Sequence, residues 1–320
     1  MVRLTIGAAQ LPDEFQRKQA DYVLSRQLDD GGWPGREGYS REGYSREGYS
    51  REGYSREGTG DVYYTSFALR SLAILGLLDG ALAERCACFI RNRVHGHETI
   101  VDLLSLVYSA KLIEAACGLD ALAAARSDWS RRLAELLGKL RRSDGGFSKS
   151  LEGQVGSTYQ TFLVLLCLEL IEQPCPDAEA VYQFLLSQRQ SDGGFLEIRV
   201  GKRSGTNPTA AAIGALSVLR RLDTDVAEQA ADFFAQRQTD EGGFQANTRI
   251  PLCDLLSTFT ACVTLADIDQ LSYISIAGAQ HYVNSMQQLN GGFRGFEFDP
   301  ADDVEYTFYG LGALALLKTT

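Results

Sequence analysis

Two kinds of apolar pattern alternate along the chain. In the first, apolar residues recur at helical spacing on one face and charged residues fill the other, as in ADYVLSRQ and EAVYQFLLSQRQ. This pattern predicts half-exposed helices over 14–27, 81–93, 128–140, 178–188, 226–237 and 274–287. In the second, apolar residues surround the helix almost completely, as in FLVLLCLELI. This pattern predicts buried helices over 62–78, 102–117, 158–171, 208–222, 255–266 and 304–317.

A short glycine-containing phrase follows most of the half-exposed helices. It reads SDGGF up to Phe147 and Phe195, DEGGF up to Phe244 and LNGGF up to Phe293, so the steps between the phenylalanines are 48, 49 and 49 residues. A related phrase, DDGGW, ends at Trp33. Glycine tolerates the left-handed conformation of a helix C-cap, so we expect the glycines to end the preceding helices.

A second phrase opens a buried helix ten residues after each aromatic. Its first residues are Ser157, Gly205, Asp254 and Asp303. In the first repeat Asp61 lies 28 residues after Trp33, and the excess falls in the low-complexity tract REGYSREGYS… at 36–58. This tract carries few apolar residues besides tyrosine, so we interpret it as an insertion in one loop. The one repeat without GGF is expected to open its buried helix at Asp102.

Twelve helices in six repeats of about fifty residues predict an all-α repeat architecture. An (α/α)6 toroid with an inner and an outer ring, formed as one domain over 1–320, fits the alternation of buried and half-exposed helices. An open solenoid of the same repeats is the alternative. No repeat at either end has the polar outer face of a cap, which favours closure into a ring.

Composition limits the class of protein and the cellular compartment that we expect. The chain is 45% hydrophobic and 22% charged, as in ordinary globular proteins, and its net charge of −10 argues against non-specific nucleic-acid binding. Its apolar runs are interrupted before the ~18 residues that a membrane span requires. The opening MVRLTIGAAQLPDEF lacks an apolar signal region, and most of the seven cysteines lie in apolar helices. We therefore expect a cytoplasmic protein with reduced thiols and no transmembrane segment.

The two phrases together resemble the repeat of the prenyltransferase and terpenoid-cyclase superfamily. The pattern Q-x-x-D-G-G-F, followed by D-x-x-x-T and an apolar helix, is most similar to that of the protein prenyltransferase β subunits of the farnesyl and geranylgeranyl transferases. The resemblance covers essentially the whole chain outside the tract at 36–58. It implies an isoprenoid diphosphate as substrate, and a helical α-type subunit or a protein substrate as partner.

The resemblance also predicts where a zinc ion would bind. Prenyltransferase β subunits hold zinc through D-x-C at the fifth inner helix and a His at the sixth. Asp254 matches the first ligand, but Leu256 stands at the Cys position and Tyr306 at the His position. Leucine offers no lone pair to a metal. We expect no cofactor, with Asp254 as the remaining metal-ligand candidate, or simply as a helix N-cap.

A terpenoid-cyclase function would need a D-x-D-D acid, in which crowded carboxyls keep one proton available. Asp303 and Glu305 have the spacing of its first two acids, but Tyr306 stands where the proton donor would be. These three residues are the catalytic candidates, and a helix cap with a solvated charged face is the alternative. Triterpene cyclases usually have a second toroidal domain, for which this chain is too short.

Aromatic residues gather in the first turns of the buried helices. We expect them to line a central funnel that accepts an isoprenoid and stabilises a carbocation through cation–π contacts. The substrate-binding candidates of this kind are Tyr63, Tyr64, Tyr159, Phe259 and Tyr309. A diphosphate would need basic partners, and Arg249, Lys202 and Arg203 lie in the loops before the buried helices.

Three functional interpretations follow from the sequence. We favour a prenyltransferase β-like protein that binds or acts on a farnesyl or geranylgeranyl diphosphate. The alternatives are a non-catalytic isoprenoid-binding or scaffold toroid, and a single-domain terpenoid-cyclase-like enzyme. An unrelated (α/α)6 glycosidase would need paired carboxylates facing the cavity, and the repeat phrases argue against it.

Overall fold

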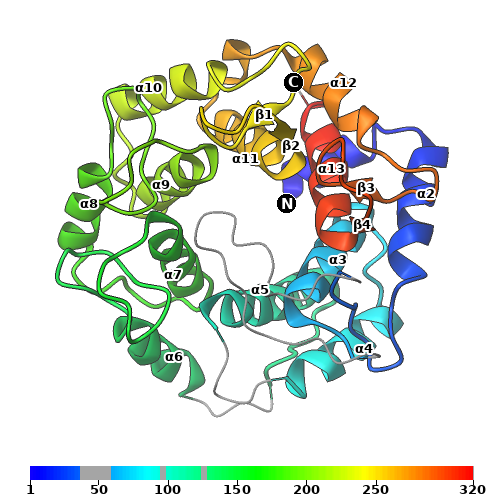
Figure 1. The fold of residues 1–320 in the computed structure, drawn as a ribbon. Helices are drawn as coiled ribbons and strands as arrows, with labels where there is room; N and C mark the ends of the chain where they lie inside the picture. The colour runs from blue at the N-terminus through cyan, green and yellow to red at the C-terminus, as the bar shows by residue number, and fades with distance from the viewer. Residues whose placement is uncertain (37–58, 94–98, 124–127, 320) are drawn as a thin grey trace.

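The computed structural model describes residues 1–36, 59–93, 99–123 and 128–319, and within them twelve of the α-helices form two concentric rings (Figure 1). The inner ring consists of α3 (Val62–Ile74), α5 (Ile100–Cys117), α7 (Thr158–Leu170), α9 (Thr206–Val218), α11 (Leu255–Asp267) and α13 (Val304–Leu316). The outer ring consists of α2 (Asp13–Leu24), α4 (Gly80–Arg91), α6 (Trp129–Gly138), α8 (Ala178–Ser187), α10 (Thr224–Ala235) and α12 (Ile276–Ser285).

The ring is closed rather than open. Each inner helix contacts the next, and α13 contacts α3. The outer layer closes in the same way, because the last glycine phrase lies against the first outer helix. A Cβ added to Gly291 would come within 2.6 Å of the carbonyl oxygen of Lys18 in α2. The prediction of an all-α toroid is confirmed, and the open solenoid is wrong.

A short helix that the apolar pattern did not predict, α1 (Val2–Ala8), packs against α13 and α3. Figure 1 shows the N-terminus within the outline of the ring, beside α11 and α13. The approach is close because Gly7 has no side chain, and an added Cβ would overlap the carbonyl of Ala315 in α13. Arg3 donates a 2.7 Å hydrogen bond to the carbonyl of Ala266 in α11. Helix α1 therefore covers the C-terminal ends of these inner helices.

The glycines of the repeated phrase have a different role from the predicted one. Helix α8 ends at Ser187 with a right-handed C-cap at Gln188, before the phrase begins. Gly193 comes later and has φ 81°, in a turn that presses against the next outer helix. The expectation that glycine caps the helix is wrong. Glycine is required because a side chain at this positive φ would meet the neighbouring helix.

The ten-residue spacing between the two phrases is set by a small hydrogen-bonded unit. Phe147 forms an antiparallel bridge with Ser157, and its amide donates to the hydroxyl of Thr161 at 3.0 Å. That hydroxyl donates to the carbonyl of Ser157 at 2.7 Å. Four other repeats pair the corresponding residues, which are Trp33–Asp61–Thr65, Phe195–Gly205–Thr209, Phe244–Asp254–Thr258 and Phe293–Asp303–Thr307. The unit explains why threonine recurs in the second phrase.

In two repeats the bridge extends into a two-stranded ladder. Strand β1 (Phe244–Gln245) pairs with β2 (Cys253–Asp254), and β3 (Phe293–Arg294) pairs with β4 (Asp302–Asp303). A 3₁₀ helix (Leu271–Tyr273) precedes α12. Every helix in the described part of the chain is too short or too polar to cross a bilayer.

The first two repeats differ from the others. Trp33 and Asp61 still form the bridge, so the two ends of the interrupted loop meet as they do elsewhere. Residues 37–58, which make up nearly all of the predicted insertion, lie outside the described residues. In the second repeat, α5 begins at Ile100, because the hydroxyl of Thr99 accepts the amide of Asp102. The prediction that Asp102 opens this helix is wrong by two residues.

Candidate functional site

Two carboxyl groups lie at the N-terminus of α13. Asp303 is its N-cap and accepts the amide of Tyr306 at 2.8 Å through Oδ1. Glu305 is buried, and its Oε1 accepts hydrogen bonds from the hydroxyl of Tyr63 and, at 3.1 Å, from the hydroxyl of Tyr309. Tyr63 comes from α3 at the other end of the chain. The fold therefore brings the predicted carboxyl pair, Asp303 and Glu305, together with two of the predicted lining residues, Tyr63 and Tyr309.

An arginine from the start of the low-complexity tract joins these carboxyls. The Nη2 atom of Arg36 lies 2.7 Å from Oδ2 of Asp299, and its Nε lies 3.3 Å from Oδ2 of Asp303. Burial and, to a smaller extent, the nearby Glu305 carboxylate together raise the pKa of Asp303 to about 7, although Arg36 opposes both effects. The site thus contains a carboxyl group that binds a proton near neutral pH.

Tyr306 lies beside this pair but is poorly suited to hold a metal. Its ring is half-buried, and the guanidinium of Arg36 lies 5.4 Å from the ring centroid. Burial, followed by the charge of Glu305, raises the pKa of the Tyr306 phenol well above its ordinary value. The phenol keeps its proton at physiological pH, so it is a hydrogen-bond donor rather than a metal ligand.

An aromatic cluster covers the inward face of α13 below the carboxyls. The ring of Tyr309 lies 5.3 Å from that of Phe67 in α3 and 5.3 Å from that of Phe259 in α11. Phe308 lies 5.6 Å from Phe67 and 5.3 Å from Phe259. Since α3 and α11 flank α13, rings that touch both helices lie on the inside of the toroid. Phe259 and Tyr309 are buried in this packed cluster rather than exposed as the walls of a funnel.

The opposite side of the inner ring presents a half-buried apolar face. On α7 this face consists of residues three or four apart, which are Tyr159, Phe162, Leu166 and Leu170. Phe162 leans onto α9 where Gly214 leaves room, because an added Cβ there would come within 2.6 Å of the phenyl ring. Of the predicted aromatic lining, Tyr159 lies on this face, and Tyr64 is half-buried on α3.

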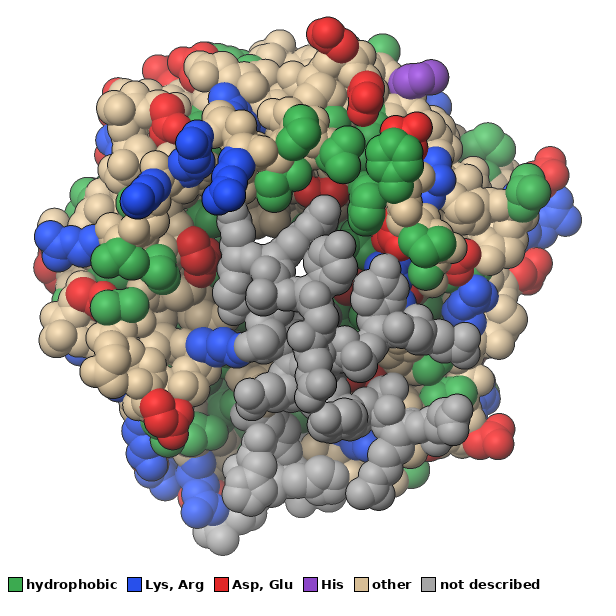
Figure 2. Space-filling view, in the orientation of Figure 1, with side chains coloured by type: hydrophobic (Ala, Val, Ile, Leu, Met, Phe, Trp, Pro, Cys, Tyr) green, Lys and Arg blue, Asp and Glu red, His purple; other side chains and the backbone are tan. Residues whose placement is uncertain are grey.

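The predicted basic residues are exposed in loops at the same end of the toroid as the carboxyls. Lys202 and Arg203 precede α9, and Arg249 precedes α11. Nη1 of Arg203 donates a 3.0 Å hydrogen bond to the hydroxyl of Thr248, which joins the two loops. Figure 2 shows Lys and Arg side chains gathered on the part of this face over α9 and α10. A diphosphate group approaching the ring from this face would meet them.

The zinc-ligand candidate Asp254 acts as the N-cap of α11. Its two oxygens accept the amide and the hydroxyl of Ser257, at 2.7 and 3.0 Å. Leu256 is half-buried, and Sγ of the preceding Cys253 lies 2.9 Å from the hydroxyl of Thr239. The residues at the three zinc positions do not fit a zinc ion. Within the described ranges no group of three His, Cys, Asp or Glu residues is placed to hold a metal.

Two arginines, one in the loop before α3 and one in α3 itself, were not identified from the sequence as site residues. Arg36 heads a low-complexity tract, and no local signal distinguishes it from the repeats that follow. Arg70 is the one charged residue of α3, VYYTSFALRSLAI, and lies among the aromatic rings. A lone charge in the middle of an apolar helix was a usable signal.

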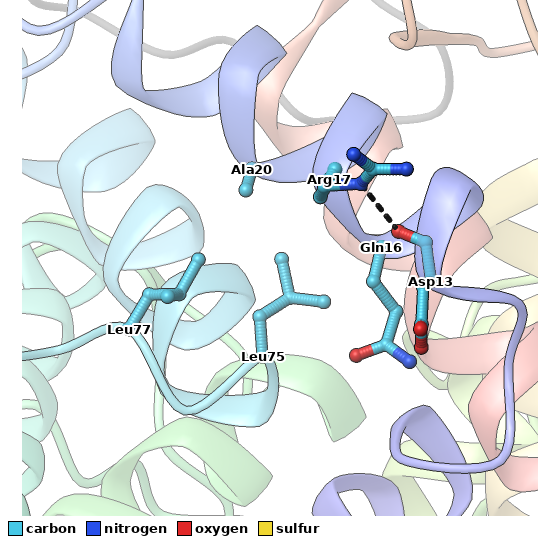
Figure 3. A pocket seen from close by; sticks show the side chains of 6 residues that line it. All are labelled: Asp13, Gln16, Arg17, Ala20, Leu75 and Leu77. Atoms are coloured by element: carbon cyan, nitrogen blue, oxygen red, sulfur yellow. Dashed lines mark hydrogen bonds between the residues drawn. The ribbon is translucent and has the colours of Figure 1, made fainter.

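A groove of about 550 Å³ lies outside the inner ring, between α2 and the C-terminal end of α3 (Figure 3). It is lined by Asp13, Gln16, Arg17, Ala20, Leu75 and Leu77. Figure 3 shows Arg17 directed toward the backbone of Asp13, to which its Nε donates at 3.4 Å. None of the residues predicted from the sequence lines this groove, so we do not include it in the site.

Comparisons with known proteins agree with this architecture. The family model described as the prenyltransferase alpha-alpha toroid domain matches residues 4–320. A search of curated proteins found no match. Among solved structures, protein geranylgeranyltransferase-I from Candida albicans, complexed with GGPP, has a TM-score of 0.68 at 18% identity, with 80% of this chain and 83% of that chain covered.

Other similar structures belong to different enzyme classes. A variant of the type II terpene cyclase MstE from Scytonema, bound to geranylgeranyl dihydroxybenzoate, has a TM-score of 0.62 at 13% identity, covering 100% of this chain and 99% of that one. A glycosidase in complex with glucose has a TM-score of 0.61 at 13% identity, covering 99% and 96%. Identities this low show the shared fold alone. This chain covers 99% of that MstE chain, so the expected lack of a second toroidal domain argues against a triterpene cyclase but not against a cyclase of MstE's length.

Proposed function

The chain belongs to the prenyltransferase alpha-alpha toroid family, and from this premise we propose that it is an enzyme that binds an isoprenoid inside the inner ring and acts on it with the carboxyls of α13. The single observation that carries the proposal is the pair Asp303–Glu305 beside the aromatic cluster. Burial raises the pKa of Asp303 to about 7, so this carboxyl can hold a proton at neutral pH.

The arrangement suits acid-initiated chemistry on an alkene. Oδ1 of Asp303 accepts the Tyr306 amide, and Oδ2 lies 3.3 Å from Nε of Arg36. Proton transfer to an alkene leaves a carbocation, and the aromatic cluster beside the carboxyls, in which the rings of Phe259 and Tyr309 lie 5.3 Å apart, can stabilise it through cation–π contacts. Glu305, which accepts two tyrosine hydroxyls, is held in one position and adds negative charge near the cation.

The apolar face of α7 supplies the binding surface for the hydrocarbon chain. Tyr159, Phe162 and Leu166 are half-buried, so a ligand that covers them removes further apolar area from water. Each Å² of such area contributes roughly 25 cal/mol. The hydrocarbon chain of the isoprenoid therefore covers this face of α7, and its reacting end faces α13.

Prenyl transfer is the second candidate, and one observation favours it. The exposed Lys202, Arg203 and Arg249 lie at the same end of the toroid as the carboxyls, where they would bind a diphosphate leaving group. In this reaction diphosphate departs and an acceptor attacks the allylic carbon. We assign no step to zinc, because Leu256 and Tyr306 do not fit as ligands.

Incubation of the purified protein with geranylgeranyl diphosphate and with geranylgeraniol distinguishes the two reactions. Acid-initiated chemistry converts an isoprenoid to isomeric products without release of diphosphate, and Asp303→Asn abolishes the conversion while keeping a good N-cap. Prenyl transfer releases diphosphate and requires an added acceptor. Saturable binding with no product would show that the protein binds isoprenoids without converting them, and would contradict the enzymatic proposal. Absence of any binding would contradict the proposal altogether.

A further inference from the structure

Arg70 has an unusual environment for a charged side chain in an inner helix. Its guanidinium lies 4.1 Å from the ring centroid of Tyr108 in α5, 4.9 Å from that of Phe67 and 5.7 Å from that of Phe308 in α13. Its Nε is buried and makes no hydrogen bond. In the described part of the chain no carboxylate forms an ion pair with Arg70, which is half-buried.

Arg70 lies on the inward side of the ring. The rings that it contacts come from α5 and α13, the two inner-ring neighbours of α3. Phe308 belongs to the aromatic cluster that spans from α3 to α11 across the inside of α13. Contact with this cluster places Arg70 toward the interior rather than toward the outer helices.

The contacts with aromatic rings leave N–H donors of the Arg70 guanidinium available to a ligand. Aromatic rings contact the face of the planar group, whereas its N–H donors point outward in the plane. A buried donor without a partner is costly, and more so when the group is charged. This cost is removed when a ligand supplies an anionic acceptor.

We propose that Arg70 binds a carboxylate of the isoprenoid ligand, so that the substrate is a prenyl chain with a carboxylic acid group rather than a simple hydrocarbon or alcohol. This proposal rests on the function proposed above. The planar fork of arginine matches the two oxygens of a carboxylate. The neighbouring helix α5 contains one basic residue, Lys111. Its Nζ is already paired with the Glu114 carboxylate at 2.9 Å. One guanidinium, that of Arg70, balances one negative charge, whereas a diphosphate would bury excess charge.

The position of Arg70 also fixes the direction of the ligand. Tyr63, which holds Glu305, and Arg70 lie seven residues apart on α3, which corresponds to about 10 Å along the helix. A carboxylate at Arg70 lets the hydrocarbon chain extend toward the carboxyls at the N-terminus of α13. In this orientation the carboxylate of the substrate binds Arg70, and an alkene far along its chain from the carboxylate contacts Asp303.

Calorimetric titration with farnesoic acid and farnesol at pH 7.5 tests the proposal. These ligands share a chain and differ in the anionic group. We expect the wild-type protein to bind the acid at least tenfold more tightly than the alcohol, because a charge-assisted hydrogen bond contributes more than 1.4 kcal/mol. Arg70→Met should abolish this preference, so that the acid binds no more tightly than farnesol. Arg70→Lys, which keeps the charge and loses the fork, should retain part of it.

Arg132→Met, an exposed arginine on outer helix α6, is the matched control and should keep the full preference. Farnesyl diphosphate forms a third arm, and tighter binding of it than of the acid, unaffected by Arg70→Met, would place anion recognition at the exposed basic loops and overturn the inference. Equal binding of acid and alcohol by the wild-type protein would overturn it as well, while the proposed isoprenoid site would stand. Binding of none of the three ligands would contradict the proposed function itself.

Discussion

The inner faces of α13 and α7, on opposite sides of the toroid, have very different surroundings. Every residue of α13 from Thr307 to Leu316 is buried, whereas α7 keeps a half-buried apolar face from Tyr159 to Leu170. The face of α13 is covered by the aromatic cluster near the carboxyls and by α1 at the other end. The α13 side of the ring is therefore closely packed around buried carboxyl groups, and the α7 side keeps an apolar surface that a ligand can cover.

Small residues account for much of the difference. Helix α13 contains the stretch GLGALAL, in which Gly312 leaves room for the ring of Phe259 and Ala315 lies against Gly7 of α1. Helix α7 contains FLVLLCLEL, in which larger side chains take the place of these small residues. The same repeat thus gives a covered face where small residues admit α1 and the ring of Phe259, and a half-buried face on α7.

The largest expected effect is a difference in stability between matched phenylalanines on the two faces. Phe308→Ala on α13 should lower the free energy of unfolding by about 3–5 kcal/mol, because it opens a cavity among buried rings. Phe162→Ala on α7 removes a half-buried ring and should cost about half as much or less. Urea denaturation of both variants measures the difference. Equal losses would show that the α7 face is as tightly packed as that of α13.

A smaller effect concerns pH and the buried carboxyl of α13. Burial raises the pKa of Asp303 from 3.8 to about 7, so the folded protein binds a proton that the unfolded chain has already lost. This contribution to stability is present at low pH and is lost as pH rises through about 7. Between pH 5 and pH 8 the loss is on the order of 2 kcal/mol.

The Asp303→Asn variant lacks this proton and should not show the loss. Thermal or urea unfolding of both proteins at pH 5, 6, 7 and 8 should therefore show wild-type stability declining relative to that of Asp303→Asn. Asparagine can still cap α13, so the comparison keeps the local helix start. Parallel profiles would show that the carboxyl titrates near its ordinary range.

The fold was predictable from the sequence because the repeat is local. Apolar spacing and the GGF period gave the twelve ring helices, with ends within a few residues of the observed ones. Helix α1 was missed, because seven residues, VRLTIGA, are too few to show a clear period. The role assigned to the glycines was wrong, because their constraint comes from the next outer helix rather than from their own.

The candidate site was only partly predictable. Asp303 and Glu305 were found through their spacing, and Tyr63 and Tyr309 through their place in the first turns of inner helices. The contact between them could not be predicted, because Tyr63 and Glu305 are 242 residues apart and meet only when the ring closes. Arg36 and Arg70 act through neighbours on other helices, and helical periodicity carries no information about such contacts.

The most direct test of the contrast between the two faces is photo-crosslinking with a geranylgeranyl probe that carries a diazirine along its chain. The labelled peptides are then identified by mass spectrometry, with unlabelled geranylgeraniol as competitor. We expect competed labelling within α7, at Tyr159–Leu170, with the α13 peptide labelled only by probes whose diazirine is at one end. Labelling confined to the outer helices, or labelling that the competitor does not reduce, would contradict an isoprenoid site inside the ring.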